Sequence, residues 1–215
     1  MPLKSLPFSE RFQDLFDFDK RVFFLMLVFL FLAIRFITND LILQSIPGYE
    51  QLEEENSLMI FHIFNTLDYL WTPFALLWKF TLTTFVIWMG TFAFGYKVKF
   101  RTIWQWVMLS EVIFIFPELI KMFYFILSTQ AADFQEIKDY YPLSLLSMFD
   151  SGELDSRYRY PLRALNLFEG LYIFALSFFF HIHSKKTLMS SFKVILGSYG
   201  LLFVLWLIFY VMVYR

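Results

Sequence analysis

Residues 21 to 43 read RVFFLMLVFLFLAIRFITNDLIL, and this stretch decides the class of the protein. Its apolar residues cover every side of a helix instead of one stripe, and helices of that kind belong in lipid or in the middle of a bundle. About 20 mostly apolar residues, rising 1.5 Å each, cross the hydrocarbon core of a membrane. We therefore predict a transmembrane helix over this stretch.

Four further stretches meet the same requirement, namely residues 70 to 95, 103 to 127, 161 to 182 and 191 to 213. The 215-residue chain is 59% hydrophobic with a mean hydropathy of +0.58, whereas soluble domains contain roughly 45–50% apolar residues. A soluble core could not bury that much apolar surface. The sequence therefore predicts an all-α, polytopic membrane bundle of five transmembrane helices, which forms one domain over residues 21 to 215.

The N-terminal segment, residues 1 to 20, contains several acids and no small-residue cleavage site after the first apolar run. It therefore does not resemble a cleaved signal peptide. Within it, residues 8 to 18 carry apolar side chains at helical spacing. This pattern predicts a short helix in the membrane interface, with an unstructured lead-in as the alternative.

The connections between the predicted spans alternate in charge. The turns at 96 to 102 and 183 to 190 contain Lys and Arg and no acid, and the N-terminal segment also carries basic residues. The longer loops, 44 to 69 and 128 to 160, are net acidic. Because basic segments stay in the cytoplasm, we predict a cytoplasmic N-terminus, exterior loops at 44 to 69 and 128 to 160, and an exterior C-terminus.

Ionisable residues inside the spans are the main candidate site, because each costs about 2.5–3.5 kcal/mol to insert at the centre of a span. Counting from the exterior ends places four of them at about one depth, with two polar neighbours a turn away. This charged layer consists of Arg35, Lys79, Glu118, Lys121, Glu169 and Asn166. We predict contacts between opposite charges, with Lys79 paired to Glu118. The layer is either a structural lock or a site for a substrate, a lipid headgroup or a proton.

Glu111 stands apart from this layer, two turns below Glu118, and no basic residue matches its depth in the sequence. It is either a protonated or hydrogen-bonded residue beside Ser198 or Tyr199, or a proton-coupling carboxylate. Pro117 lies between the two acids and should bend their helix or open a polar groove, because proline removes a backbone donor.

Motifs for catalysis are missing. The chain has no cysteine and no P-loop, GxGxxG, HExxH, GxSxG or EF-hand pattern. His181 and His183 point to different faces of a helix, and no carboxylate completes a metal set. We therefore expect no enzyme activity, no cofactor, no metal and no nucleic-acid partner.

Three segments resemble Yip1-domain integral membrane proteins. LDYLWTPFALLWKFTL, residues 67 to 82, is similar to the signature that opens their membrane region, with an extra residue after Asp68 and Thr72 where that family prefers Gly. FGYKVKFRTIWQWVMLSEVIFIFPELI and YPLRALNLFEGLYIFALSFFFHIHSKKTL resemble the family's third and fourth spans. The resemblance implies five spans with a cytoplasmic N-terminus, and the short lead-in is similar to that of bacterial members.

Two functional hypotheses follow. The first is a non-enzymatic subunit or scaffold of a membrane assembly, or an organiser of lipids and proteins, with membrane proteins docking on the exterior loops. The alternative is a small transporter or lipid-handling protein that uses the charged layer. Water distinguishes them, since a scaffold should seal the layer whereas a transporter needs it to open into a cavity. We expect the bacterial inner membrane, with a eukaryotic endomembrane as the alternative.

Overall fold

The computed structural model describes residues 19–44, 59–127, 137, 140–149 and 154–214. Every regular element in these residues is helical, and their only bridge of extended backbone joins Ser144 to Asn166. The predicted all-α class is therefore confirmed. The predicted interfacial helix at residues 8 to 18 lies outside the described residues.

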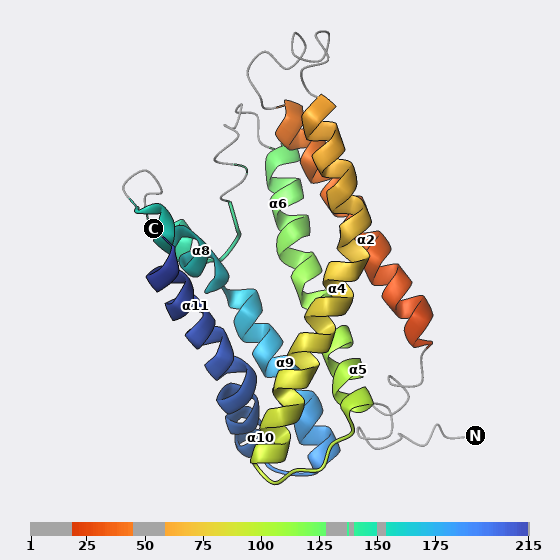
Figure 1. Ribbon diagram of the computed structural model, residues 1–215, viewed down its shortest axis with the longest axis vertical. Helices are drawn as coiled ribbons and strands as arrows, with labels where there is room; N and C mark the ends of the chain where they lie inside the picture. The colour runs from red at the N-terminus through yellow and green to blue at the C-terminus, as the bar shows by residue number, and fades with distance from the viewer. Residues whose placement is uncertain (1–18, 45–58, 128–136, 138–139, 150–153, 215) are drawn as a thin grey trace, which may run out of the picture.

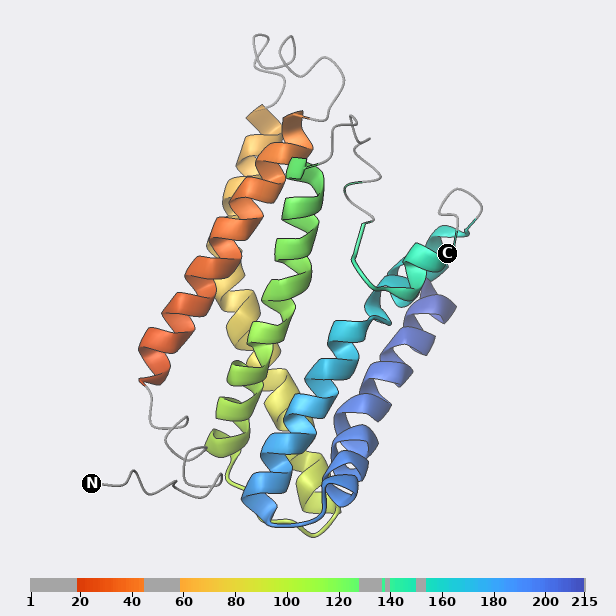
Figure 2. The ribbon, with the colours of Figure 1, turned by 180° about the vertical axis from the view of Figure 1, so that it is seen from behind.

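The first half of the chain forms three helical columns that lie side by side in Figures 1 and 2. They are α2 (Lys20–Gln44), α4 (Met59–Ala93), and a third column of α5 (Phe100–Ser110), the 3-10 turn η1 (Glu111–Phe114) and α6 (Ile115–Leu127). The elements of the third column follow one another without a gap. α2 packs on both α4 and α6.

The second half forms two more columns, which lie beside the lower part of α4 in Figure 1. They comprise the turn η2 (Leu145–Met148), the short helix α8 (Ser156–Ala164), α9 (Leu167–Ser184), and a last column of α10 (Leu188–Ile195), the π-helical turn η3 (Leu196–Gly200) and α11 (Leu201–Val213). α8 packs against the upper end of α11.

Four helices among the described residues are long and apolar enough to cross a membrane, and they span Lys20–Asn39, Ile63–Ala93, Leu167–Ser184 and Leu188–Val213. The fifth predicted span, 103 to 127, lies in the third column. This column, α5 with η1 and α6, is not among these four.

The described surface exposes large apolar side chains over most of its length. Phe29, Trp78 and Phe92 expose 69 to 70% of their area, and Met212 exposes 75%. In water, contiguous apolar surface of this kind is unfavourable, whereas lipid tails solvate it. The exposed surface is therefore consistent with an integral membrane protein.

In the lower half of the bundle, Trp106 of α5 is 1% exposed and contacts the rings of Phe180 and His183 edge-on. Close by, α4 meets η3 at Gly90. A Cβ on Gly90 would lie 2.1 Å from Cβ of Ser198, so only glycine fits at this crossing. Small residues permit such close approaches between membrane helices.

The two basic turns lie at the same end of the bundle, the lower end in Figure 1. The first connects α4 to α5 through Gly95, whose φ of 79° suits glycine. The second follows α9, where Lys185 adopts a left-handed conformation and caps the helix by donating its N–H to the carbonyl of His181. The two basic segments, which are far apart in the sequence, thus lie together at one end of the bundle.

The predicted exterior loop 44 to 69 is too long, because α4 already begins at Met59. Residues 59–69 contain apolar side chains three and four positions apart and neither Gly nor Pro, so the helix continues past the apolar stretch. At 35 residues α4 is about 52 Å long, well beyond the hydrocarbon thickness of about 30 Å. Asp68 therefore lies on a helix and not in a loop.

The predicted fourth span, 161 to 182, is interrupted. α8 ends at Ala164 and α9 begins at Leu167, with Asn166 in extended conformation between them. The backbone at this break pairs with residues 143–145. The N–H of Leu145 donates to the carbonyl of Leu165, and the N–H of Leu167 donates to the carbonyl of Leu143. Pairing with the stretch that precedes η2 satisfies the backbone groups that the break exposes.

Candidate functional site

The central contact of the site joins α4 to η1. Nζ of Lys79 lies 2.6 Å from Oε1 of Glu111, and the same ammonium lies 4.2 Å from the ring centroid of Phe114. The side chain of Glu111 is 1% exposed, whereas that of Lys79 is 43% exposed. The expectation that Glu111 is isolated was therefore wrong, and so was the pairing of Lys79 with Glu118.

The 3-10 turn explains this correction. Pro117 has no N–H for the carbonyl of Ile113, and the four residues before Ile115 tighten into η1. A 3-10 turn advances 120° per residue instead of 100°, so four residues rotate the column by about 80° more than an α-helix would. Glu111 is therefore rotated relative to Glu118 and contacts Lys79, while both carboxylates line the same cavity.

Arg35 makes its contacts with α4. Its Nη2 lies 2.9 Å from Oδ2 of Asp68, and its Nη1 donates to Oγ1 of Thr72 at 3.3 Å. Both members of the ion pair are about half exposed, so the pair contributes little to stability. Among the described residues, Arg35 therefore forms its ion pair with Asp68 and not with Glu118 or Glu169 as the predicted layer required.

Glu118 lies among three positive charges instead. Those that act on its carboxylate are, in order of strength, Lys121, Arg163 and Arg35. Lys121 is three residues further along α6, which is the spacing of neighbours on one helix face. Glu118 therefore belongs to the outer part of the site, together with Arg163 from α8.

Glu169 contacts the last column. The hydroxyl of Tyr199 in η3 donates to its Oε1 at 2.6 Å. Asn166 caps α9, because its Oδ1 accepts the backbone N–H of Glu169 at 2.9 Å while its amide donates to the carbonyls of Arg163 and Ala164. Asn166 thus fixes the start of the helix that carries Glu169, and it does not bind the carboxylate.

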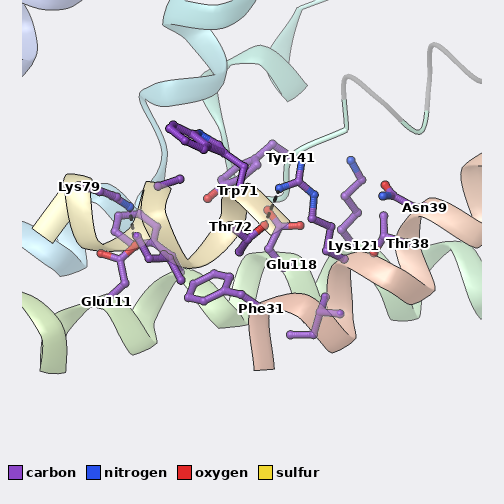
Figure 3. A pocket seen from close by; sticks show the side chains of 15 residues that line it. Phe31, Thr38, Asn39, Trp71, Thr72, Lys79, Glu111, Glu118, Lys121 and Tyr141 are labelled. Atoms are coloured by element: carbon purple, nitrogen blue, oxygen red, sulfur yellow. Dashed lines mark hydrogen bonds and ion pairs between the residues drawn. The ribbon is translucent and has the colours of Figure 1, made fainter. Parts of the chain in front are cut away.

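A cavity of about 520 Å³ lies between α2, α4 and the third column, and Figure 3 shows its lining. Five ionisable side chains of three columns reach it, namely Arg35, Lys79, Lys121, Glu111 and Glu118. Its apolar lining includes Phe31, Trp71 and Leu76. The charged residues thus line an open cavity, and their ion pairs do not fill it.

Tyr141 closes one side of the cavity from the segment between α6 and α8. Burial, and then the negative charges of Glu118 and Glu169, raise the pKa of its phenol far above the usual range. Tyr141 therefore stays a neutral hydroxyl and can donate a hydrogen bond to an anion. Glu169 itself lies outside the cavity lining, in a second groove along α9 and α11.

No group of three or more His, Asp or Glu that could hold a metal ion occurs among the described residues. His183 packs edge-on against Trp106, and Nδ1 of His181 contacts the carbonyl of Lys186. The two histidines therefore belong to the lower end of the bundle and do not meet at a site.

Sequence reasoning missed three residues of the site: Asp68, Thr72 and Tyr141. Thr72 already lay in the predicted span 70 to 95, and the helical pattern of residues 59–69 would have placed Asp68 on the same helix, one turn before it. Tyr141 comes from a loop without periodicity, so the sequence carries no signal that would bring it to α4.

No protein-family model matches the chain, and neither does any curated protein or solved structure. The resemblance to Yip1-domain proteins therefore stays a prediction.

Proposed function

We propose that this protein is a five-span, non-enzymatic integral membrane protein that binds an amphiphile with an anionic headgroup in the cavity between α2, α4 and the third column. A cytoplasmic N-terminus puts the basic turns inside and opens the cavity toward the exterior half of the membrane. The third column then supplies the fifth span, with its polar residues turned to the cavity. A bacterial inner membrane remains the expected location.

The observation that carries this proposal is the lining of the cavity. Arg35 and Lys79 keep 44% and 43% of their side chains exposed, so their cationic groups are accessible to a ligand. Phosphates and carboxylates are the anions that such groups bind. The lining holds three cations and two carboxylates, an excess of one positive charge. Arg163, which acts on Glu118, and Asp68, which pairs with Arg35, add one charge of each sign and leave that excess unchanged.

The apolar part of the lining favours an amphiphile over a simple ion. Phe31, Trp71 and Leu76 share the cavity with the charged groups, and Trp71 is 65% exposed on α4. A headgroup could contact the charges while the adjoining hydrocarbon lies against these side chains. Binding sites commonly combine apolar walls with a few placed polar groups.

A structural lock or a scaffold would bring the charges together and leave no space between them. The open lining argues against that hypothesis, although it excludes no partner on the exterior loops. Lipid handling, which the sequence offered as the alternative, is therefore the preferred function.

Lipid titration tests this proposal. The protein in a neutral maltoside detergent would be titrated with dioctanoyl phosphatidylglycerol, dioctanoyl phosphatidylcholine and inorganic phosphate, and binding followed by native mass spectrometry. We expect phosphatidylglycerol to bind, and the Arg35→Gln/Lys121→Gln variant to bind it at least tenfold more weakly. Competition by inorganic phosphate would identify the anion, not the tail, as the main determinant.

Lys99→Gln/Arg101→Gln is the matched control, because it removes the same charge from the basic turn at the opposite end of the bundle. It should bind phosphatidylglycerol like the unmodified protein. Equal weakening in both double variants, or no preference for phosphatidylglycerol over phosphatidylcholine, would contradict the proposal.

A further inference from the structure

An apolar groove of about 500 Å³ lies between α4 and the last column. Side chains of α4, Tyr199 of η3 and side chains of α11 form its walls, and the described residues that line it include no Lys, Arg, His, Asp or Glu. The hydroxyl of Tyr199 already donates to Glu169. The groove therefore offers hydrocarbon contacts and few hydrogen bonds.

The groove results from the way in which α4 meets the last column. α4 packs closely on η3, where a Cβ on Gly90 would lie 2.1 Å from Cβ of Ser198, but it makes few contacts with α11. Above this crossing the two columns diverge (Figure 1). The space between them is bordered by Leu82 and Val86 of α4 and by Leu202 and Trp206 of α11.

The groove and the charged cavity lie on one face of α4. Thr72, Leu76 and Lys79 line the cavity, and Thr83 and Val86 line the groove. These positions follow one another at intervals of three or four residues, which places them one above the other on a helix. One turn of α4 separates Lys79 in the cavity from Thr83 in the groove. The two sites therefore adjoin along α4.

We propose that the groove holds a hydrocarbon chain of the same lipid whose anionic headgroup binds in the cavity. This inference rests on the proposed function and narrows the ligand to a lipid whose chain reaches beyond the cavity. Lys79 and Val86 are seven residues apart, so the groove extends about 10 Å further along the helix axis than the lysine. Apolar side chains of the cavity contact the first part of the hydrocarbon, and the groove holds the rest of one chain.

The order of the two sites is that of a lipid in the exterior leaflet. With the basic turns in the cytoplasm, Lys79 lies nearer to the exterior than Val86, because α4 runs toward the first basic turn. A lipid with its phosphate in the cavity therefore directs its chain toward the middle of the membrane and into the groove. A lipid of the cytoplasmic leaflet would have the opposite orientation.

Chain length tests the groove. Leu202 and Leu201 are neighbours on α11 and expose 46% and 55% of their area, but only Leu202 lines the groove. The unmodified protein, Leu202→Trp and the matched control Leu201→Trp would be titrated in maltoside with dihexanoyl and dioctanoyl phosphatidylglycerol, and binding followed by native mass spectrometry. Partition of the lipids into micelles is the same for all variants, so differences between variants report on the groove.

We expect Leu202→Trp to reduce the preference for dioctanoyl over dihexanoyl phosphatidylglycerol at least threefold, and Leu201→Trp to leave it unchanged. Val86→Phe fills the groove from the opposite wall and should also reduce this preference. Equal preferences in Leu202→Trp, Val86→Phe and Leu201→Trp would overturn the groove as a chain site, whereas binding of both lipids would still support the proposed function. Failure of both lipids to bind the unmodified protein would overturn the proposed function and this inference together.

Crosslinking locates the chain directly. Phosphatidylglycerol with a diazirine at the end of one chain should label residues 82–86 or 202–209. Arg35→Gln/Lys121→Gln should lose most of this labelling, because the headgroup no longer holds the lipid, and Lys99→Gln/Arg101→Gln should keep it. Undiminished labelling in the first variant would show chains of bulk lipid in the groove, and labelling only at α2 and the third column would place the chain elsewhere. A dimer that protects the groove would show a second copy there, and each of these three results overturns the proposal.

Discussion

Nζ of Lys79 and Oε1 of Glu111 lie 2.6 Å apart, although 32 residues separate them in the sequence. The contact is unequal, because Glu111 is buried whereas Lys79 reaches into the cavity. Loss of the lysine would therefore leave a buried carboxylate without its cation. Loss of the glutamate would leave a lysine that water in the cavity can still solvate.

We predict that Lys79→Met lowers the free energy of unfolding by about 1–3 kcal/mol, less than the roughly 3–5 kcal/mol for fully buried pairs because Lys79 is partly exposed. Lys79→Met/Glu111→Leu should recover most of this loss, since it removes both charges and keeps similar volume. Lys79→Met/Glu118→Leu is the matched comparison and should recover none. Thermal unfolding in detergent measures all three variants, and recovery by the Glu118 double variant would reject the assigned pair.

The crossing of α4 and η3 gives a steric prediction. Gly90→Ala places a Cβ 2.1 Å from Cβ of Ser198 and should destabilise the protein by about 1–3 kcal/mol. Gly170→Ala is the matched control, because a Cβ there meets no atom within 4 Å and alanine favours helix. Gly90→Ala/Ser198→Gly should regain part of the lost stability. Equal unfolding temperatures for the two single alanine variants would show that the helices are further apart than described.

Membrane topology is testable with single cysteines, since the chain has none of its own. In intact cells, Lys99→Cys and Lys186→Cys should be protected from a membrane-impermeant thiol reagent, because both basic turns are expected in the cytoplasm. Ser156→Cys at the start of the exposed helix α8 should react. Permeabilised cells should label all three. Reaction of Lys99→Cys from outside would contradict the proposed orientation.

Most of the fold could be predicted from hydropathy and charge. Four of the predicted spans correspond to helices that can cross a membrane, and both basic turns connect helices at the same end of the bundle. The errors concern positions where a helix begins or ends at a different residue from the apolar stretch. The predicted second span begins at residue 70, whereas the helix begins at Met59. The predicted span 161 to 182 contains Asn166, which caps α9 and divides the span. Backbone hydrogen bonding decides these boundaries, and hydropathy does not report it.

The sequence predicted most of the charged residues of the candidate site, but it did not predict which of them contact one another. Depth counting brought Lys79 and Glu118 to one level because it started the second span at residue 70, whereas α4 begins at Met59. The 3-10 turn rotates Glu111 toward Lys79, and the sequence does not show how far such a turn extends. The cavity itself depends on three columns and Tyr141, so no local pattern could reveal it.

The central claim is that the charged side chains line an open cavity, and the accessibility of Ala75 in its wall tests this most directly. A cysteine at Ala75 should react with a negatively charged, membrane-impermeant thiosulfonate, and bound dioctanoyl phosphatidylglycerol should slow the reaction. Cysteines at Leu77, exposed on another face of α4, and at the fully buried Ile87 should react far more slowly. An unreactive Ala75→Cys in a protein whose Ser156→Cys reacts would show that the charges are sealed, and would contradict the account.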